Sequence, residues 1–529
     1  MFWADHIAEE IIRKKGEQAA KRPLVIRDEK TASGRVHVGS MRGVAVHGLI
    51  AEELAERGVP HRFIYEINDF DPMDGLPVYL DEATFRPHMG KPLYAVPSPD
   101  PKFPNYAEYF GQEFMGVIND TGFYPEFTRT SELYKSGQMN EVIRTALEQA
   151  PKIREIYEDV SNSVKDADWL PISVICEKCG KIGTTKAVSF DGQKVHYTCE
   201  PKMVEWAVGC GHEGDISPFD GNAKLPWKVE WAAKFKALGV DIEGAGKDHA
   251  TKGGARDVAD RISREVFQYE PPFDIKYEFF LIAGKKMSSS KGKGASARDI
   301  ADILPPKIFR LALIGKDVHQ QVNFDPEGDT IPVLFDTYDT FAQHYFDGER
   351  DDYHRLFQFI HPPTKEGKRE IAHAFPPRFS QVAFIVQMPH LNLLEEVEKM
   401  KGTPLNEEDK EEAQMRAEYA KKWLAIYAPL DFKFELQTEV PEAAKNFSAE
   451  QKKALKEVLV YIESTQKLDG QELHTKLHEI WKEAGLQAQE FFSALYLSFL
   501  GKPSGPKAGW FLSVLKRKYL LKRLEEVSH

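Results

Sequence analysis

A run of two cations, three hydroxyls and a glycine, Lys-Met-Ser-Ser-Ser-Lys-Gly, occupies residues 286–292. The preceding residues 277–282 are aromatic and apolar and predict a buried strand, which Ala283-Gly284 would end. A loop of cations and hydroxyls leaving a strand suits a polyphosphate that gains negative charge during a reaction. A solvated loop between two elements is the alternative interpretation.

A second stretch with the residue types for phosphate binding lies near the N-terminus. Residues 24–26 predict a strand, 28–34 a polar loop, 37–40 (His-Val-Gly-Ser) the start of a helix, and 62–67 a second strand. The apolar positions Val38, Met41, Ala45 and Leu49 share one face of that helix. This order is the first βαβ unit of a doubly wound sheet. Its helix N-terminus favours phosphate, and Gly39 admits a close backbone approach.

These two stretches resemble the signatures of class I aminoacyl-tRNA synthetases. His-Val-Gly-Ser at 37–40 is similar to their His-Ile-Gly-His, and residues 286–290 are similar to their Lys-Met-Ser-Lys-Ser loop, in the same order. More closely, the chain resembles the class I lysyl-tRNA synthetase family over roughly its first 300 residues. The matching pieces are Trp3-Ala4-Asp5, Thr31-Ala32-Ser33-Gly34, Ser131-Glu132-Leu133-Tyr134-Lys135, Ala245-Gly246-Lys247-Asp248-His249, Tyr277-Glu278-Phe279 and residues 286–292.

The resemblance implies a site for ATP and its magnesium ion. His37 would donate a hydrogen bond to the phosphates, and Lys286 would close over the pyrophosphate. Ser289 stands where the general class I pattern has a second lysine. Either Lys291 takes that catalytic role or the loop relies on hydroxyls. The implied ATP-binding residues are Ser33, His37, Gly39, Ser40, Gly246, Asp248, Lys286, Met287, Ser288 and Ser289.

The resemblance also implies a lysine pocket formed by Thr31, Trp231, His249 and Tyr277. Trp231 and Tyr277 would form the apolar wall for the four-carbon stem and face its ammonium group. The family usually has a small residue, often glycine, two positions before Thr31, where this chain has Glu29. Glu29 is either a solvent-facing loop charge or a partner for an ammonium group of the substrate.

All four cysteines of the chain lie between positions 176 and 210. Cys176 and Cys179 form one pair, Cys199 and Cys210 the other, and an Asp-Gly hairpin is predicted between the pairs. This is the pattern of a zinc ribbon, in which two loops offer thiolates to one tetrahedral ion. A redox Cys-x-x-Cys or structural thiols are the alternatives. His212 could replace Cys210 as the fourth ligand.

The predicted fold is an α/β protein with three parts. Residues 1–282 form a Rossmann-like, doubly wound parallel-sheet catalytic domain with a zinc-ribbon module at about 170–215. An insertion at about 71–130 is proline-rich and irregular over residues 71–110, and residues 106–117 predict a helix. Residues 283–335 contain the signature loop and a region that contacts the tRNA stem. Residues 336–529 form an all-α helical bundle, which by resemblance binds the anticodon. A helix is expected after a capping box at Ser296, and another after Ser448.

Composition sets wider limits. A chain of 529 residues exceeds one hydrophobic core, and 42% hydrophobic and 29% charged residues are ordinary for a globular protein. The net charge of −12 does not indicate a nucleic-acid binder, although local basic patches decide binding. Apolar runs are too short to span a membrane, and the N-terminus does not resemble a signal peptide. A cytoplasmic, monomeric enzyme without DNA or membrane partners is expected.

The function predicted from this resemblance is activation of L-lysine with ATP and transfer of lysine to the 3′ end of tRNA(Lys). The four cysteines would bind a structural zinc ion. Two alternatives remain at this point: a class I synthetase for another amino acid, such as glutamate or arginine, and an inactive zinc-containing RNA-binding protein. Retention of His37, Gly39, Asp248 and Lys286 argues against the second.

Overall fold

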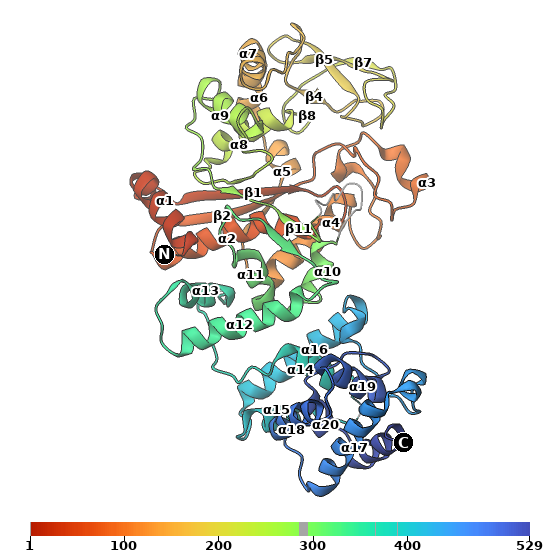
Figure 1. Ribbon diagram of the computed structural model, residues 1–529. Coiled ribbons are helices and arrows are strands. Elements are labelled where there is room, and N and C mark those ends of the chain that lie inside the picture. Colours follow the sequence, from red (N-terminus) through yellow and green to blue (C-terminus); the bar gives the residue numbers. More distant parts are fainter. Residues whose placement is uncertain (1, 285–294, 365–366, 389) are drawn as a thin grey trace. The chain divides into compact units, whose positions relative to one another are not determined.

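The computed structural model describes residues 2–284, 295–364, 367–388 and 390–529 (Figure 1). The predicted signature loop at 286–292 therefore lies outside the described residues. The chain divides into two compact units, Met1–Phe324 with Phe341–Ile371 and Asp325–Thr340 with Ala372–His529. Within the described residues, no helix is both long and apolar enough to cross a membrane.

A parallel sheet forms the centre of the first unit. Strands β1 (Leu24–Thr31), β2 (His61–Asn68) and β3 (Glu126–Arg129) pair in parallel in that order. On the other side of β1, parallel bridges join Ile26 to Ile242 and Ile242 to Phe273. Those segments lead into β9 (Ala245–Gly246) and β10 (Lys276–Tyr277), which also pair in parallel. The order β3-β2-β1-β9-β10 is that of a doubly wound sheet, as predicted.

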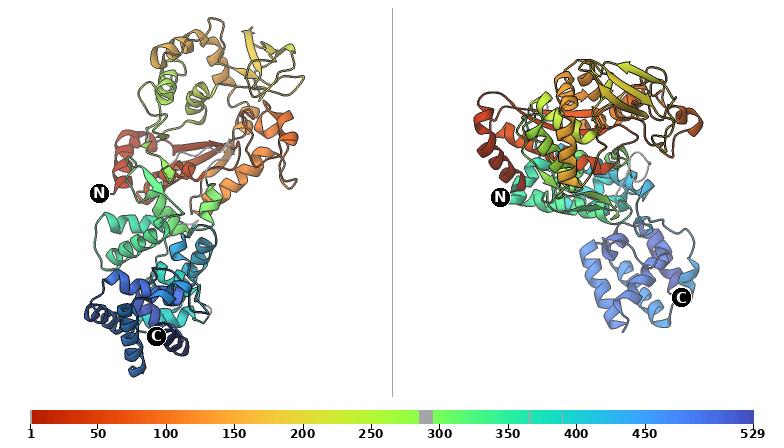
Figure 2. Two further views of the ribbon diagram at one scale, coloured as in Figure 1. Left: turned by 45° about the vertical axis from the view of Figure 1, so that its right-hand side comes forward. Right: turned by 90° about the horizontal axis from the view of Figure 1, so that it is seen from above.

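Helices cover this sheet and complete its crossovers. Helix α1 (Trp3–Ala19) and helix α2 (Met41–Glu56) pack against β1, and α2 also against β2 (Figures 1 and 2). The 3₁₀ turn η1 (Val38–Ser40) precedes α2. The predicted apolar face is confirmed, since Val38, Met41, Ala45 and Leu49 are fully buried. The remaining crossover helices are α4 (Tyr106–Asp120), α8 (Trp227–Leu238) and α9 (Ala255–Glu265).

Three local predictions differ from the structure. Strand β1 continues to Thr31, where a polar loop was expected from residue 28, because its last residues pair with Tyr65 to Asn68 of β2. The irregular insertion is shorter than predicted, since α4 and β3 already belong to the sheet domain; it contains only α3 (Glu82–Phe85) and 3₁₀ turns. The expected single strand at 277–282 is two strands, β10 and β11 (Phe280–Ile282). Glu278 donates its N–H to Val318 between them, so the chain passes to a second sheet.

The cysteine-bearing module interrupts the sheet domain. It follows helices α5 (Thr130–Lys135), α6 (Asn140–Glu148) and α7 (Ala150–Ser161), and begins with β4 (Ser173–Val174), which pairs with β8 (Ala223–Lys224). Strands β5 (Thr185–Phe190), β6 (Val195–Cys199) and β7 (Glu213–Ile216) form its antiparallel sheet. The predicted Asp-Gly hairpin is confirmed: the Asp191 carboxylate accepts the N–H groups of Gln193 and Lys194, and Gly192 has φ 98°.

The first unit ends in elements that follow the signature loop. Strand β11 pairs in parallel with β12 (Val322–Phe324), and α10 (Ala297–Ala301) and α11 (Pro306–Ile314) lie between them in the sequence. The predicted capping box is present, because Ser296 accepts the N–H of Asp299 and Asp299 accepts the N–H of Ser296. Helix α13 (Asp352–Ile360) returns to this unit, where Arg355 pairs with Asp5 and Glu53.

The second unit is helical. Helix α12 (Thr330–Phe346) runs through the division between the units. The others are α14 (Phe379–Ile385), α15 (Leu393–Lys401), α16 (Glu407–Ile426), α17 (Ala449–Ser464), α18 (Gly470–Glu483), α19 (Ala488–Leu500), α20 (Ala508–Ser513) and α21 (Arg517–Val527). The capping box predicted at Ser448 is present at the start of α17.

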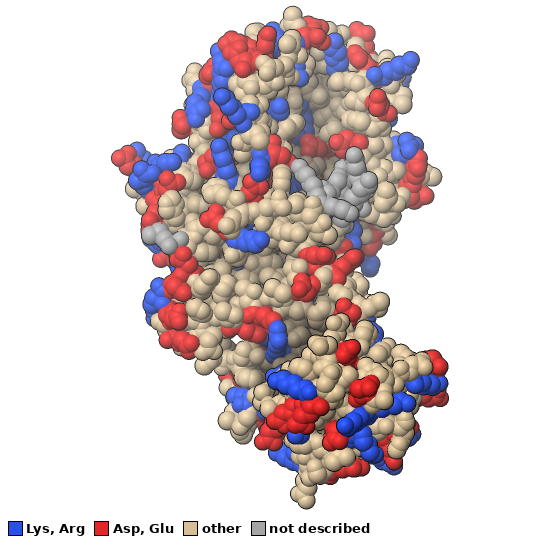
Figure 3. Space-filling view, in the orientation of Figure 1, with Lys and Arg blue, Asp and Glu red and all other residues tan. Residues whose placement is uncertain are grey.

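The C-terminal segment 502–523, which is rich in basic and aromatic residues, packs largely against the rest of the helical bundle. Arg523 is buried and donates to the carbonyls of Ser498 and Gln437, and Arg517 donates to carbonyls at the end of α17. The Trp510 ring packs against Phe384 at 5.0 Å. On the face shown in Figure 3, Lys and Arg side chains alternate with Asp and Glu over this unit instead of gathering in one basic patch.

Candidate active site and metal centre

A cavity of about 370 Å³ lies at the carboxyl end of β1, where the sheet order changes direction between β1 and β9. Ligands of doubly wound sheets bind in this crevice. Nine of the predicted site residues line it: Glu29, His37, Gly39, Ser40, Trp231, Gly246, Asp248, His249 and Tyr277. Thr31 and Ser33 do not. The Thr31 hydroxyl donates to Asp71 at 2.8 Å, and the Ser33 carbonyl accepts the hydroxyl of Tyr106 at 3.0 Å.

The His-Val-Gly-Ser turn and the residues that flank the signature loop meet at this cavity. His37 forms an antiparallel bridge with Ser296, Val38 donates its N–H to Ala295, and Ala297 donates its N–H to Val36. On the other side of the loop, Phe280 and Leu281 line the cavity. The segments that flank the loop, β11 before it and residues 295–297 after it, therefore both lie beside residues 36–40.

Two glycines are fixed by close packing around the cavity. A Cβ on Gly39 would lie 3.0 Å from the carbonyl oxygen of Phe280, a backbone atom that cannot easily move. A Cβ on Gly43 would lie 2.7 Å from the Tyr277 hydroxyl and 2.8 Å from an oxygen of Asp28. At Gly39 the turn η1 approaches β11, and at Gly43 the first turn of α2 approaches β10, more closely than a larger residue would allow.

An aromatic wall closes one side of the cavity. Trp231 and Trp227 stack with ring centroids 6.1 Å apart and planes inclined by 24°, and the His249 ring meets both edge-on at 6.1 and 5.4 Å. Trp231 also donates its indole N–H to Glu243 at 2.6 Å. The wall thus combines apolar ring faces with a nearby carboxylate, which suits an alkyl chain that ends in a cation.

A buried ion-pair network lies directly behind this wall. Arg27 is fully buried and makes pairs with Glu66 at 2.9 Å, Glu243 at 3.0 Å and Glu29. Lys234, also fully buried, pairs with Glu66 at 2.6 Å, Glu29 at 2.9 Å and Glu230 at 3.4 Å. The network continues through Lys224, which pairs with Glu230 and Asp71. These pairs join the carboxylates Glu29, Glu66, Asp71, Glu230 and Glu243 to the cations Arg27, Lys224 and Lys234, five acids to three bases.

Burial and mutual attraction shift the pKa values of the network in opposite directions. Burial alone would lower the pKa of Lys234, but Glu230, Glu29 and Glu66 outweigh it and hold the pKa above its ordinary value. Burial would raise the pKa of Glu66, yet Lys234 and Arg27 hold it well below the usual range. For Glu243, burial dominates and the pKa is raised despite Arg27. The cavity wall therefore retains an acid that a further cation would stabilise in its charged form.

The structure decides against one of the two roles considered for Glu29, that of a solvent-facing loop charge. It lies on strand β1 at the cavity wall, with the side chain 31% exposed, and not on a solvent-facing loop. Its oxygen Oε2 accepts from both Arg27 and Lys234. Neither of these bonds uses Oε1.

Several cavity residues were not predicted from the sequence: Asp28, Lys30, Arg42, Tyr65, Glu243, Gly244, Ala245, Phe280 and Leu281. Asp28 and Lys30 could have been found from the alternation along β1, had that strand been extended past residue 26. Glu243 and Tyr65 had no comparable signal, because only the register between strands brings them to the cavity.

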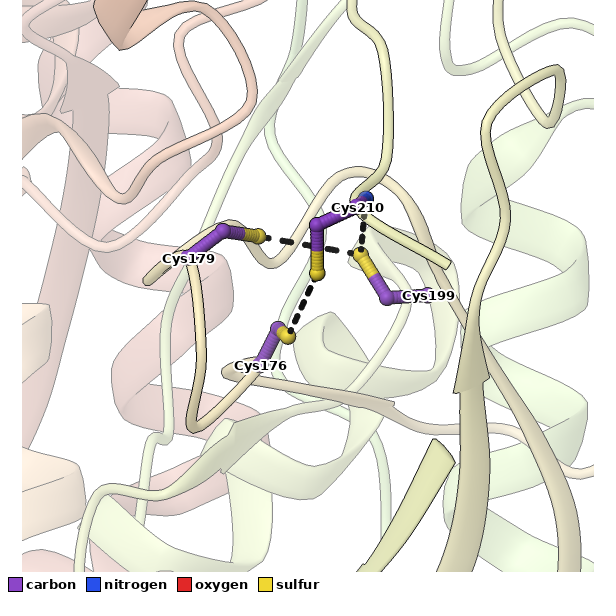
Figure 4. Close-up of side chains that lie close together, drawn as sticks. All are labelled: Cys176, Cys179, Cys199 and Cys210. Atoms are coloured by element: carbon purple, nitrogen blue, oxygen red, sulfur yellow. Dashed lines mark hydrogen bonds between the residues drawn. The ribbon is translucent and has the colours of Figure 1, made fainter. Parts of the chain in front are cut away.

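The four cysteines converge in the inserted module (Figure 4). Their sulfur atoms all lie within 4.8 Å of one another, with 3.6 Å between Cys176 and Cys210 and 3.7 Å between Cys179 and Cys199. A tetrahedral zinc ion with bonds of about 2.3 Å separates its sulfur ligands by about 3.8 Å. The spacing thus fits one tetrahedral ion, whereas a disulfide requires about 2.05 Å.

The surroundings of the cysteines also suit thiolates. Cys199 accepts the backbone N–H of Cys210 at 3.3 Å and lies 3.3 Å from the Thr184 hydroxyl. His212, considered as a replacement for Cys210, is not part of the cluster; its ring packs edge-on against Tyr197 at 6.0 Å. Cys210 is the fourth member because the chain turns at Gly209 to Gly211 and brings its sulfur beside Cys176.

Comparisons with known proteins agree with this architecture. The family model described as tRNA synthetases class I (K) matches residues 1–362, and that of an anticodon binding domain matches residues 387–528. A Lysine--tRNA ligase of Methanosarcina barkeri (strain Fusaro / DSM 804) is 34% identical, over 100% of this chain and 98% of its own length. The Lysine--tRNA ligase of Pyrococcus horikoshii is 32% identical, over 99% of both chains.

Among solved structures, a glutamate tRNA ligase from Elizabethkingia meningosepticum aligns with 96% of this chain and 99% of its own, at 12% identity and a TM-score of 0.42. That likeness is too low to bear on function. The doubly wound sheet with its His-Val-Gly-Ser turn, joined to a helical unit that matches an anticodon binding domain, is that of a class I aminoacyl-tRNA synthetase. Within that class, the chain belongs to the tRNA synthetases class I (K).

Removal of the buried lysine should destabilise the sheet domain. Lys234→Ala leaves Glu29, Glu66 and Glu230 short of a cation, so unfolding in urea should show a loss of about 3–5 kcal/mol. Lys236→Ala on the same helix is the matched control, because Lys236 is 36% exposed and pairs with Glu141 at the surface; its loss should stay below about 0.5 kcal/mol. Equal stability of the two variants would mean that the network contributes nothing.

Proposed function

We propose that this protein is a lysine–tRNA ligase. It activates L-lysine with ATP, giving lysyl-adenylate and pyrophosphate, and transfers the lysyl group to the 3′ end of tRNA(Lys). The observation that carries this proposal is similarity to Lysine--tRNA ligases over the whole chain, combined with a cavity at the switch point of the sheet. A synthetase for glutamate or arginine is disfavoured by the family match, and an inactive RNA-binding protein by the close-packed cavity.

ATP would bind in the part of the cavity that lies beside the start of α2. ATP would lie over Gly39 and Gly246, with His37 and Ser40 donating to its phosphates and Asp248 accepting from a ribose hydroxyl. Lys286, Met287, Ser288 and Ser289 would close over the pyrophosphate, with Lys291 as a second cation. Magnesium would accompany the phosphates. Because the lysine carboxylate itself attacks phosphorus, these residues act by positioning and by stabilising charge.

The amino-acid side of the cavity is the aromatic wall with its carboxylates. Trp231 and Tyr277 would hold the alkyl stem, and His249 would cover it. Glu29 and Glu243 offer negative charge at the same wall, backed by a network with more acids than bases. Lysine carries one ammonium group more than most amino acids, so such a wall favours it over glutamate by charge and over neutral residues by pairing. Thr31 would act only indirectly, by holding Asp71.

The remaining parts have supporting roles. The cysteine cluster would hold one structural zinc ion and so fix the inserted module. The helical unit would bind the anticodon of the tRNA, in line with the match to an anticodon binding domain. The proposal includes a protein that works as a monomer in the cytoplasm.

Lysine-dependent pyrophosphate exchange tests the function directly. The protein should exchange pyrophosphate into ATP with lysine at least tenfold faster than with arginine or glutamate, and should then charge a tRNA(Lys) transcript. The acidic wall disfavours glutamate by charge, and the similarity to Lysine--tRNA ligases is the reason for ranking lysine above arginine. Preferential exchange with any other amino acid would overturn the proposal.

Glu29 is the residue of this pocket that differs from the family pattern. Glu29→Gln keeps the size of the side chain and removes its charge, while Arg27 and Lys234 retain their other partners. The KM for lysine should rise roughly tenfold, the cost of one charged hydrogen bond, with little change in the KM for ATP. Glu17→Gln, an exposed change on α1, serves as the control. Unchanged lysine kinetics would confine Glu29 to a structural role.

The metal centre is tested by metal analysis. Protein purified without chelator should contain one zinc ion per chain, and Cys179→Ser should lose it and lower the melting temperature of the protein. His212→Ala is the matched control, since His212 lies outside the cluster, and it should keep its zinc. Zinc loss in His212→Ala would make His212 a ligand, retention of zinc in Cys179→Ser would remove Cys179 from the site, and absence of zinc in the wild type would refute the site.

A further inference from the structure

Helix α2 carries a fully buried histidine that none of the functions assigned above uses. The Nε2 atom of His47 accepts the backbone N–H of Gly244 at 2.7 Å. The ring proton therefore lies on Nδ1, which is 2.8 Å from the carbonyl oxygen of Gly43 and 3.5 Å from a carboxylate oxygen of Asp28. His47 thus joins α2 to the segment before β9 and to strand β1.

The contacts of His47 end at residues that line the active-site cavity. Asp28, Gly244 and Tyr277 all belong to its wall, and the rings of His47 and Tyr277 meet edge-on at 6.3 Å. A Cβ on Gly244 would lie 2.4 Å from the carbonyl oxygen of Ile275 and 3.2 Å from Nε2 of His47, so this passage of the chain requires glycine. His47 itself is not among the described residues that line the cavity. It can act on a substrate only through the residues that it holds.

Asp28 is the residue through which such an effect would reach the substrate. Its side chain is 14% exposed, and its Oδ1 accepts the backbone N–H of Glu29 at 2.8 Å. Within the described part of the chain, no lysine or arginine forms an ion pair with Asp28. Glu29 and Glu243 of the same cavity, in contrast, are both paired with Arg27. An incoming ammonium group would therefore meet a carboxylate at Asp28 that no cation of the described chain already neutralises.

The two carboxylates near the end of β1 face opposite sides of the sheet. Side chains alternate along a strand. Asp28 faces α2, where its Oδ2 would lie 2.8 Å from a Cβ on Gly43. Glu29 faces α8, where it pairs with Lys234. An amino acid in the cavity can thus meet one carboxylate on each side.

The direction of the reaction decides which ammonium group meets which carboxylate. ATP is proposed to bind beside the start of α2, whereas the aromatic wall belongs to α8. The carboxylate of the amino acid must reach the α-phosphorus, so the α-carbon lies on the α2 side and the side chain extends toward α8. The α-ammonium group is bonded to that carbon and consequently lies on the side of Asp28, while the ε-ammonium group lies on the side of Glu29.

We propose that Asp28 binds the α-ammonium group of the amino-acid substrate and that His47 is its positioning residue. The N–H of Glu29 holds Oδ1, and the Nδ1 proton of His47 attracts Oδ2 toward α2. The carboxylate is thereby kept in one orientation, and the substrate carboxylate bonded to the same α-carbon is directed toward ATP. This inference rests on the proposed function, because it takes the amino-acid substrate and the place of ATP from it.

Binding of two ligands that differ only at the α-carbon tests the proposal. L-Lysine and ε-aminocaproate share the carboxylate and the ε-ammonium group, but ε-aminocaproate has no α-ammonium group. Asp28→Asn keeps the size of the side chain and removes its charge. By titration calorimetry, the variant should bind lysine roughly tenfold more weakly, the cost of one charged hydrogen bond, and should bind ε-aminocaproate within about twofold of the wild type.

Two substitutions of His47 test its part. His47→Gln keeps an acceptor for the N–H of Gly244 and a donor on the side of Asp28, so its affinity for lysine should stay within about threefold of the wild type. His47→Leu keeps neither and should lose roughly fivefold in lysine affinity, again without an effect on ε-aminocaproate. Melting temperatures check that both variants are folded. If His47→Leu does not fold, His47→Gln and Asp28→Asn still decide the outcome.

Asp168→Asn is the matched control, because Asp168 is 63% exposed and does not line the cavity; it should bind both ligands as the wild type does. Unchanged lysine affinity in Asp28→Asn would overturn the proposal. An equal loss for both ligands would also overturn it, since Asp28 would then act on the shape of the pocket and not on the α-ammonium group. Failure of the proposed function would look different, as absent lysine-dependent pyrophosphate exchange in the wild type.

Discussion

The arrangement of the active site depends on a buried set of opposite charges beneath the crevice of the sheet. Arg27 comes from β1, Glu66 from β2, Lys234 from α8 and Glu243 from the segment before β9, so four elements of the sheet domain meet through them. Each of these charges is almost completely buried and would be costly alone. Because each of these residues has at least two partners, the ion pairs and hydrogen bonds fix the relative positions of the four elements. These positions determine the shape of the cavity.

The excess of acids over bases in this network connects stability with substrate choice. Burial raises the pKa of Glu243 in spite of the nearby guanidinium groups of Arg27 and Arg256, so a further cation beside this carboxyl group would favour its charged form. The remaining negative charge lies at the wall where an ammonium group of the substrate would arrive. A pocket of this type selects a cationic amino acid because the ligand completes a charge balance that the protein leaves open.

The inserted module is connected to the active site through helix α8. Its cysteine cluster fixes a small antiparallel sheet, and the chain returns from it through β8 directly into α8. Trp227, Trp231 and Lys234 are spaced i, i+4 and i+7 along helix α8 and therefore share one face, so a single element contributes to the aromatic wall and to the ion-pair network.

The sequence alone determined the features whose interactions are local. The turn at Asp191, the capping boxes at Ser296 and Ser448, and the apolar face of α2 follow from residues within a few positions of one another. The motifs at 37–40 and 245–249 likewise identified part of the cavity wall. These could be predicted because backbone geometry brings near neighbours together whatever the rest of the chain does.

Tertiary structure decided what depends on distant partners. Glu29 and Lys234 are 205 positions apart, and nothing near either residue indicates that they pair. The division of 277–282 between two sheets, the choice of Cys210 over His212 and the contact of His47 with Gly244 have the same origin. Each is fixed by strand register and by helix packing across the fold. A single sequence lists the charges and rings, but only the folded chain determines which of them meet.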